Sequence, residues 1–230
     1  LTSLIPLALA VAQTRAGRVR WLALAACVAG MAALLLGLSR AGLAALVAGL
    51  VCLGIFQRRW LPAAAAVLLI AVQLLTVPEP VKQWAKDQPS FLVKLASPDR
   101  LGYWHVAYKM VCAHPLVGVG ANTFVKSFSR YTWPEDPFRE TPPYAHNMYL
   151  HLAAELGLLG LGVFGLLLLR VGRLLWSDDG LTHEWLRVAR DGLGAGLVAY
   201  LVLGCFESSL FYSRASIVFW MLIALIVSWA

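Results

Sequence analysis

Six apolar runs, separated by short polar loops and one long polar segment, constrain the fold of this chain more than any other feature. The runs are Trp21–Leu38, Ala41–Phe56, Trp60–Val77, Asn147–Leu169, Gly192–Tyr212 and Ala215–Ala230. At about 1.5 Å per residue, such runs approach the roughly 30 Å thickness of a hydrocarbon core. Of the 230 residues, 60% are hydrophobic and 13% are charged, whereas soluble domains have about 25% charged residues. The sequence therefore predicts an all-α, polytopic membrane protein.

The start of the chain does not have the pattern of a signal peptide. Leu1-Thr2-Ser3 provides neither an initiator Met nor a basic stretch. The apolar stretch Leu4–Ala12 is too short to span a bilayer. We therefore expect the chain to begin partway through a helix, as the C-terminal part of a longer protein or as a truncated form.

The basic residues predict on which side of the membrane each loop lies. Nine of the 19 lysines and arginines lie in three short loops, Gln13–Arg20, Gln57–Arg59 and Arg170–Asp191; eight more lie in the segment 78–145, which is too long for the charge rule to apply. Alternation of sides places all three on one face, which the positive-inside rule makes cytoplasmic. This distribution explains much of the net charge of +7 without a nucleic-acid partner. The opposite, periplasmic face then receives the turns at Ser39-Arg40 and Tyr212–Arg214 and the long segment 78–145.

The long segment contains the signals of one helix. Ser97-Pro98 favours a helix start, with Ser97 as the N-cap and Pro98 in the first turn. His114-Pro115 should end the helix. Between them, aromatic and aliphatic residues recur at helical spacing, which predicts an amphipathic helix at the bilayer interface. These residues are Leu101, Trp104, Tyr108 and Val111.

The rest of the long segment is expected to be a bend followed by extended chain. Gly118-Val119-Gly120 predicts a flexible bend, and four prolines between Pro134 and Pro143 keep the chain extended up to His146. We therefore divide the chain into three parts. Residues 1–77 are transmembrane helices, the first of them partial; 78–145 form a periplasmic loop with an amphipathic helix at about 98–113; 146–230 contain three C-terminal transmembrane helices.

Two arginines lie where a charge needs an explanation. Arg40 stands between two apolar runs, either as a snorkelling residue at a tight turn or as a clamp for phosphate oxygens. Arg100 lies in the first turn of the predicted helix, where the dipole disfavours a cation but favours an anion. It could pair with Asp99 or help to bind an anionic ligand.

His146 and Asn147 stand at the start of an apolar run. The positive end of the helix dipole should disfavour an imidazolium, and a neutral ring can accept a proton from a hydroxyl. On residue type alone, a histidine at such a boundary is more often an ordinary interface residue than a base. Asn147 could cap the helix or orient the ring.

Two carboxylates lie inside predicted spans and need a partner or a proton. Glu155 lies two turns into the run that follows His146, and Glu207 lies within Gly192–Tyr212. We expect Glu207 to pair with Arg214.

The glycines and the cysteines do not predict a cofactor site. Gly157, Gly160 and Gly162 lie in an apolar run without a preceding strand, so they favour close helix packing over a nucleotide loop. The four cysteines form no CxxC pair, and His146 and His151 are five residues apart, which does not place them on one helical face. No metal ion and no cofactor are therefore expected.

Taken together, these residues resemble the bacterial family of O-antigen ligases and polymerases, and O-antigen ligases most closely. The resemblance covers about Trp21–Leu169. It is carried by four motifs: Ser39-Arg40-Ala41-Gly42; Arg100 with Tyr103-Trp104; the stretch from His114-Pro115 to Phe124; and His146-Asn147 followed after nine residues by Gly157 and Gly160. Two departures are Ala41, where members often have glycine, and the missing N-terminal helices.

The resemblance implies a GT-C-like helical bundle in the bacterial inner membrane, with a metal-independent active site on the periplasmic face. The implied reaction moves a glycan from undecaprenyl pyrophosphate to the lipid A-core, with inversion, in lipopolysaccharide biosynthesis. It also implies that His146, Arg40 and Arg100 are catalytic, and that both arginines bind substrate. Asn147 and Arg214 are further substrate-binding candidates.

Other functions stay open. Within the class they are an O-antigen or exopolysaccharide polymerase and a protein O-oligosaccharyltransferase. Outside it, the alternative is a transporter of lipid-linked sugars, although the polar residues gather on one predicted face rather than along a path across the membrane.

Overall fold

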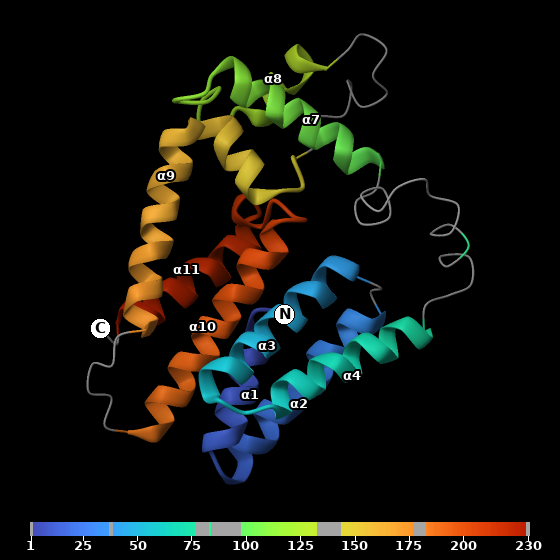
Figure 1. Cartoon of the computed structure of the whole chain (residues 1–230), viewed down its shortest axis with the longest axis vertical. Helices are drawn as coiled ribbons and strands as arrows, with labels where there is room; N and C mark the ends of the chain where they lie inside the picture. The colour runs from blue at the N-terminus through green and yellow to red at the C-terminus, as the bar shows by residue number, and fades with distance from the viewer. Residues whose placement is uncertain are drawn as a thin grey trace. The chain divides into compact units, whose positions relative to one another are not determined.

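The computed structural model describes residues 2–36, 39–76, 83, 98–132, 144–176 and 183–228. All regular secondary structure in these residues is helical, which confirms the all-α prediction for the described part of the chain. In chain order (Figure 1) the helices are α1 (Leu4–Thr14), α2 (Gly17–Leu36), α3 (Arg40–Gln57), α4 (Leu61–Thr76), α7 (Pro98–Ala113), α8 (Phe124–Tyr131), α9 (Met148–Trp176), α10 (Glu184–Gly204), the short 3₁₀ helix η1 (Ser209–Phe211) and α11 (Ser213–Val227).

Three of the described helices are long and apolar enough to cross a membrane: α2, α3 and α9. α1 and α11 are apolar but shorter. The first turns of α10 carry Arg187, Arg190 and Asp191. The protein is therefore a membrane protein by the length and composition of its helices, and the further predicted spans stay predictions.

The helix predicted for the fifth apolar run has the wrong bounds. The prediction places it over Gly192–Tyr212, but α10 covers Glu184–Gly204 and the chain leaves the helix at Cys205. The helix ends where the Cys205 carbonyl accepts a hydrogen bond from Asn147 Nδ2, 3.1 Å away. This side-chain donor satisfies a carbonyl that has no partner within the helix. Glu207 consequently lies in a bend outside the helix.

The chain divides into two compact units, which we describe separately. Unit 1 comprises Leu1–Pro78, Arg170–Leu203 and Ser216–Ala230; unit 2 comprises Glu79–Leu169 and Gly204–Ala215. The predicted division into three consecutive parts follows the chain order and stays a prediction.

Unit 1 is held together by small residues that let helices approach closely. A Cβ on Gly192 of α10 would lie 2.6 Å from the Cβ of Ala10 in α1, and one on Gly49 of α3 would lie 2.9 Å from the Cβ of Ala199 in α10. In membrane helices such contacts supply packing that the hydrophobic effect does not.

At the start of α3, Ser39 accepts a hydrogen bond from the Gly42 N–H (3.1 Å) and so caps the helix next to Arg40.

Unit 2 has its own apolar core, formed where α7 and α8 pack against the start of α9. Buried members of this core are Val106, Ala107, Met110, Phe124, Phe128, Ala145 and Ala154. The predicted helix 98–113 is confirmed, whereas its predicted N-cap Ser97 lies outside the described residues. Of the predicted stripe, Val111 packs against this core, whereas Tyr108 is 60% exposed; the predicted position at the bilayer interface stays a prediction. The prolines from Pro134 to Pro143 also lie outside the described residues.

Candidate active site

His146 lies in a turn that is fixed on both sides. The Oδ1 of Asn147 accepts hydrogen bonds from the N–H groups of Tyr149 and Leu150, both at 3.0 Å, so Asn147 caps α9. His146 itself has a positive φ of 49°, which is uncommon for a residue other than glycine. The indole of Trp104 donates to the His146 carbonyl (3.4 Å), and the Tyr103 ring stacks on the imidazole at 5.7 Å between centroids. The backbone and the ring of His146 are thus both held in place. The cap of α9 is one of the two roles expected of Asn147.

The Glu207 carboxylate joins Arg100 and His146 into one cluster. Its Oε1 lies 2.7 Å from Arg100 Nη2 and its Oε2 lies 3.1 Å from His146 Nδ1. The three side chains come from the first turn of α7, the turn before α9 and the bend after α10. The side chain of Arg100 is 24% exposed, that of Glu207 31% and that of His146 28%, so a substrate can reach them. All three residues belong to unit 2.

The expected pairing of Glu207 with Arg214 is therefore wrong. One carboxylate oxygen of Glu207, Oε1, accepts a hydrogen bond from Arg100, and the other, Oε2, contacts His146. The expectation assumed a continuous helix through Glu207, but α10 ends at Gly204 and α11 begins at Ser213. Arg214 is exposed in the first turn of α11, and its predicted role in substrate binding stays a prediction.

Glu207 was not among the site residues predicted from the sequence, and its carboxylate contacts one of the two ring nitrogens of His146. A carboxylate beside Nδ1 favours the tautomer that carries its proton on Nδ1. The other ring nitrogen, Nε2, then has a free lone pair that can accept a proton. The signal in the sequence was an acidic residue within an apolar run, because such residues are rarely without a function.

The electrostatics of the cluster limit how strongly it can bind an anion. With a neutral ring, the charges of Arg100 and Glu207 cancel, so the three side chains together carry no net charge. Tyr212 lies close enough to respond to this charge. Burial, and next the negative charge of Glu207, raise the pKa of the Tyr212 phenol, while Arg100 opposes the shift. Tyr212 therefore stays a neutral hydrogen-bond donor near the cluster at physiological pH.

A second, buried network supports the segment that carries Glu207. His151 is 1% exposed, and its Nδ1 lies 3.2 Å from the hydroxyl of Ser208, the neighbour of Glu207. Its ring stacks on Phe211 at 3.7 Å and on Phe124 at 4.4 Å. The Nε2 of His151 lies 3.5 Å from Glu155. The network thus links α9 to the chain between α10 and α11.

Glu155 has the partners that a buried carboxylate requires. It accepts hydrogen bonds from the backbone N–H groups of Asn122 (2.8 Å) and Phe124 (2.9 Å), at the start of α8. These bonds compensate its burial at 4% exposure. Glu155 therefore fixes the loop before α8 to α9.

Gly157 allows the loop before α8 to cross α9. Its φ of 68° and ψ of −171° break the helix, and a Cβ at this position would clash with the backbone of Leu116. Four backbone hydrogen bonds pair the interrupted helix with the loop: Val119 N to Ala154 O, Gly120 N to Glu155 O, Leu158 N to Pro115 O and Leu159 N to Leu116 O. The predicted bend at Gly118–Gly120 is present, but the prediction that Gly157 serves close packing between helices is wrong.

The remaining predicted catalytic residue, Arg40, belongs to unit 1. It is the exposed first residue of α3. Its convergence with Arg100 and His146 stays a prediction. As for metals, no group of three or more His, Cys, Asp or Glu side chains in the described residues could hold an ion.

The fold and the site define a class: an all-helical membrane protein with a carboxylate–histidine–arginine cluster suited to proton transfer. The family model described as O-antigen ligase matches residues 23–165, more than half of the chain, and the chain belongs to this family. Membership confirms the resemblance and indicates glycosyltransferase activity in a general sense. The match includes Arg40, Arg100 and His146, whereas Glu207 lies beyond it. A comparison with curated proteins finds no match.

Proposed function

We propose that this chain is a GT-C-like glycosyltransferase of the O-antigen ligase type. It transfers a polysaccharide from undecaprenyl pyrophosphate to the lipid A-core during lipopolysaccharide biosynthesis, at the periplasmic face of the inner membrane. Transfer is inverting and needs no metal ion. The observation that carries the proposal is the 3.1 Å contact between Glu207 and His146 Nδ1, because it prepares the ring to act as a base.

The reaction is a single displacement at the anomeric carbon. The acceptor hydroxyl gives its proton to His146 Nε2 while its oxygen forms a bond to the anomeric carbon. The bond from that carbon to the phosphate oxygen breaks, and undecaprenyl pyrophosphate leaves with the bonding electrons. Glu207 holds the Nδ1 proton and stabilises the imidazolium that forms.

The arginines act on the leaving group. Arg100 uses Nη2 to hold Glu207, so its other N–H groups are the donors for the pyrophosphate. Because Glu207 offsets the charge of Arg100, Arg40 supplies further positive charge as the bond to phosphate breaks. Arg214 and Asn147 are secondary candidates for substrate contact, and the cap formed by Asn147 favours a positioning role for it.

Transfer in vitro from a defined undecaprenyl-pyrophosphate glycan tests the proposal. Three acceptors are offered separately: lipid A-core, a second molecule of donor and a peptide. We expect elongation of the lipid A-core. Elongation of the second donor would instead identify a polymerase, and elongation of the peptide a protein O-oligosaccharyltransferase. Net movement of the donor across vesicles without transfer would support a transporter.

A further inference from the structure

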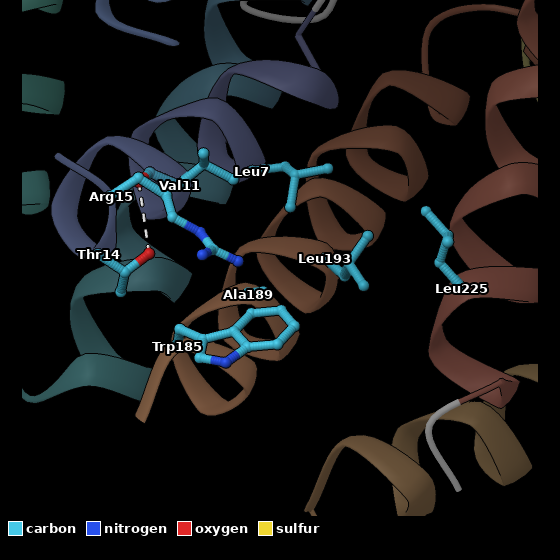
Figure 2. A pocket seen from close by; sticks show the side chains of 8 residues that line it. All are labelled: Leu7, Val11, Thr14, Arg15, Trp185, Ala189, Leu193 and Leu225. Carbon is cyan, nitrogen blue, oxygen red and sulfur yellow. Dashed lines mark hydrogen bonds between the residues drawn. The ribbon is translucent and has the colours of Figure 1, made fainter. Parts of the chain in front are cut away.

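Unit 1 contains a cavity of about 300 Å³ that is lined by α1, α10 and α11. Figure 2 shows its lining side chains. Most of the wall is apolar, and the polar side chains come from the end of α1 and the start of α10. The lining consists of Leu7, Val11, Thr14, Arg15, Trp185, Ala189, Leu193 and Leu225.

The polar end of this cavity is built around Arg15. Its guanidinium carbon lies 4.7 Å from the ring centroid of Trp185 (Figure 2). Stacking on an aromatic face leaves the N–H groups of the guanidinium, which lie in its plane, available to phosphate oxygens. Within the described residues, no carboxylate forms an ion pair with Arg15. The N-terminus of α10, at Glu184, adds the positive end of a helix dipole.

The surroundings of Arg15 are rich in positive charge. Arg18 and Arg20 follow it in the first turn of α2, and Arg187 lies one turn into α10; all three are exposed. Glu184 is the competing acid at the start of α10. Basic groups at the membrane surface attract anionic lipids, and the positive-inside rule assigns this end of unit 1 to the cytoplasmic leaflet.

The apolar walls indicate what else the ligand must contain. Free phosphate has no apolar part that could pack against Leu7, Val11, Leu193 and Leu225. A peptide segment would bring backbone polar groups that these side chains cannot satisfy. An acyl chain fills such a space without any unsatisfied polar group.

We propose that this cavity binds an anionic glycerophospholipid from the cytoplasmic leaflet. The phosphate lies on Arg15, beside the N-terminus of α10, and one acyl chain lies along the leucine and valine side chains. The site belongs to unit 1, whereas the Glu207 cluster belongs to unit 2, so the proposal does not depend on the proposed catalytic function.

Native mass spectrometry of the purified full chain tests this site. The protein is taken from bilayers containing phosphatidylglycerol and phosphatidylcholine, and the retained lipid is counted. We expect selective retention of phosphatidylglycerol and about fivefold weaker retention in Arg15→Ala, which loses one cation near a phosphate. Arg18→Ala is the matched control, because it removes the same charge from a residue outside the lining.

A second variant tests the apolar part without changing any charge. Leu225→Trp should fill the cavity and also release phosphatidylglycerol, while thermal unfolding in detergent checks that the variant is folded. Equal retention by Arg15→Ala and Arg18→Ala would overturn the proposal. Equal retention of phosphatidylcholine and phosphatidylglycerol by the unchanged chain would overturn it as well. Leu225→Trp keeps the proposal testable if Arg15→Ala does not fold.

Discussion

At the scale of single residues, the Glu207 carboxylate distinguishes a catalytic histidine from an interfacial one. Glu207→Gln keeps the shape of the side chain but removes the charge that holds the Nδ1 proton of His146. We expect kcat for glycan transfer to fall by about 10²-fold or more, with a smaller effect on the KM for donor. Initial rates with a defined donor measure this. Glu184→Gln, at an exposed position of unit 1, is the matched control and should keep the normal rate.

The same argument requires that His146→Ala abolish transfer while donor still binds. Cells that carry only this variant should lack long-chain lipopolysaccharide on gels. Normal long chains in those cells would show that His146 is not the base, whatever Glu207→Gln does.

Arg100 has two tasks in the proposal, and a lysine can perform only one of them. Arg100→Lys keeps a positive charge for the pyrophosphate but loses the planar group that can hold Glu207 and donate elsewhere at once. We expect Arg100→Ala to raise the donor KM and lower kcat, and Arg100→Lys to lower kcat mainly. Steady-state kinetics separate the two constants. Identical effects of both variants on KM would contradict the division of tasks.

The sequence was sufficient to predict His146 and Arg100 as site residues, but not Glu207 as their link. Glu207 lies 107 positions from Arg100 and 61 from His146 along the chain. Its apolar neighbours suggested a continuous helix, because hydropathy does not register the end of α10 at Gly204. Only the three-dimensional structure shows which carboxylate reaches the ring.

At the scale of elements, the crossing of α9 by the loop before α8 depends on Gly157. Gly157→Ala would place a Cβ against the backbone of Leu116 at a positive φ. Strain of this kind costs about 1–3 kcal/mol, before the cost of the clash itself. We therefore expect a lower unfolding temperature in detergent and loss of transfer. The control is Gly162→Ala, where an added Cβ has no atom within 4 Å. An unchanged unfolding temperature for Gly157→Ala would contradict the crossing.

Glu155 stabilises the same crossing from its other side. Glu155→Gln would direct an NH₂ group toward at least one of the N–H groups of Asn122 and Phe124. An unsatisfied buried donor costs about 1–3 kcal/mol, so we expect a lower unfolding temperature with a parallel loss of activity. If the buried network only stabilises the fold, the donor KM of the folded fraction should stay normal. A raised donor KM in that fraction would mean that Glu155 contributes to binding.

The elements themselves were predictable in proportion to their apolar content. α2, α3 and α9 follow from runs long enough to span a bilayer. α8 was missed because it is only eight residues long and carries Lys126, Ser127, Ser129 and Arg130 beside its buried phenylalanines. The kink at Gly157 was missed because its cause is a backbone contact with a distant loop, which periodicity does not report.

At the scale of the whole molecule, the proposed reaction requires Arg40 of unit 1 to act on the same pyrophosphate as Arg100 of unit 2. Arg40→Ala and Arg100→Ala should each weaken donor binding. If both side chains contact one pyrophosphate, the double variant should lose less than the sum of the two free-energy changes, with a coupling of about 0.5–3 kcal/mol. Equilibrium binding of a non-transferable donor analogue to the four proteins measures this cycle.

Additivity in that cycle would contradict the convergence and leave Arg40 as a snorkelling residue at the start of α3. Arg58, also an exposed arginine of unit 1, provides the control: Arg58→Ala combined with Arg100→Ala should be additive. Coupling with Arg40 but not with Arg58 would support the proposal that Arg40 and Arg100 contact the same pyrophosphate. Since the charge of Arg100 is offset by Glu207, the cycle also tests whether the second cation that the pyrophosphate requires comes from unit 1.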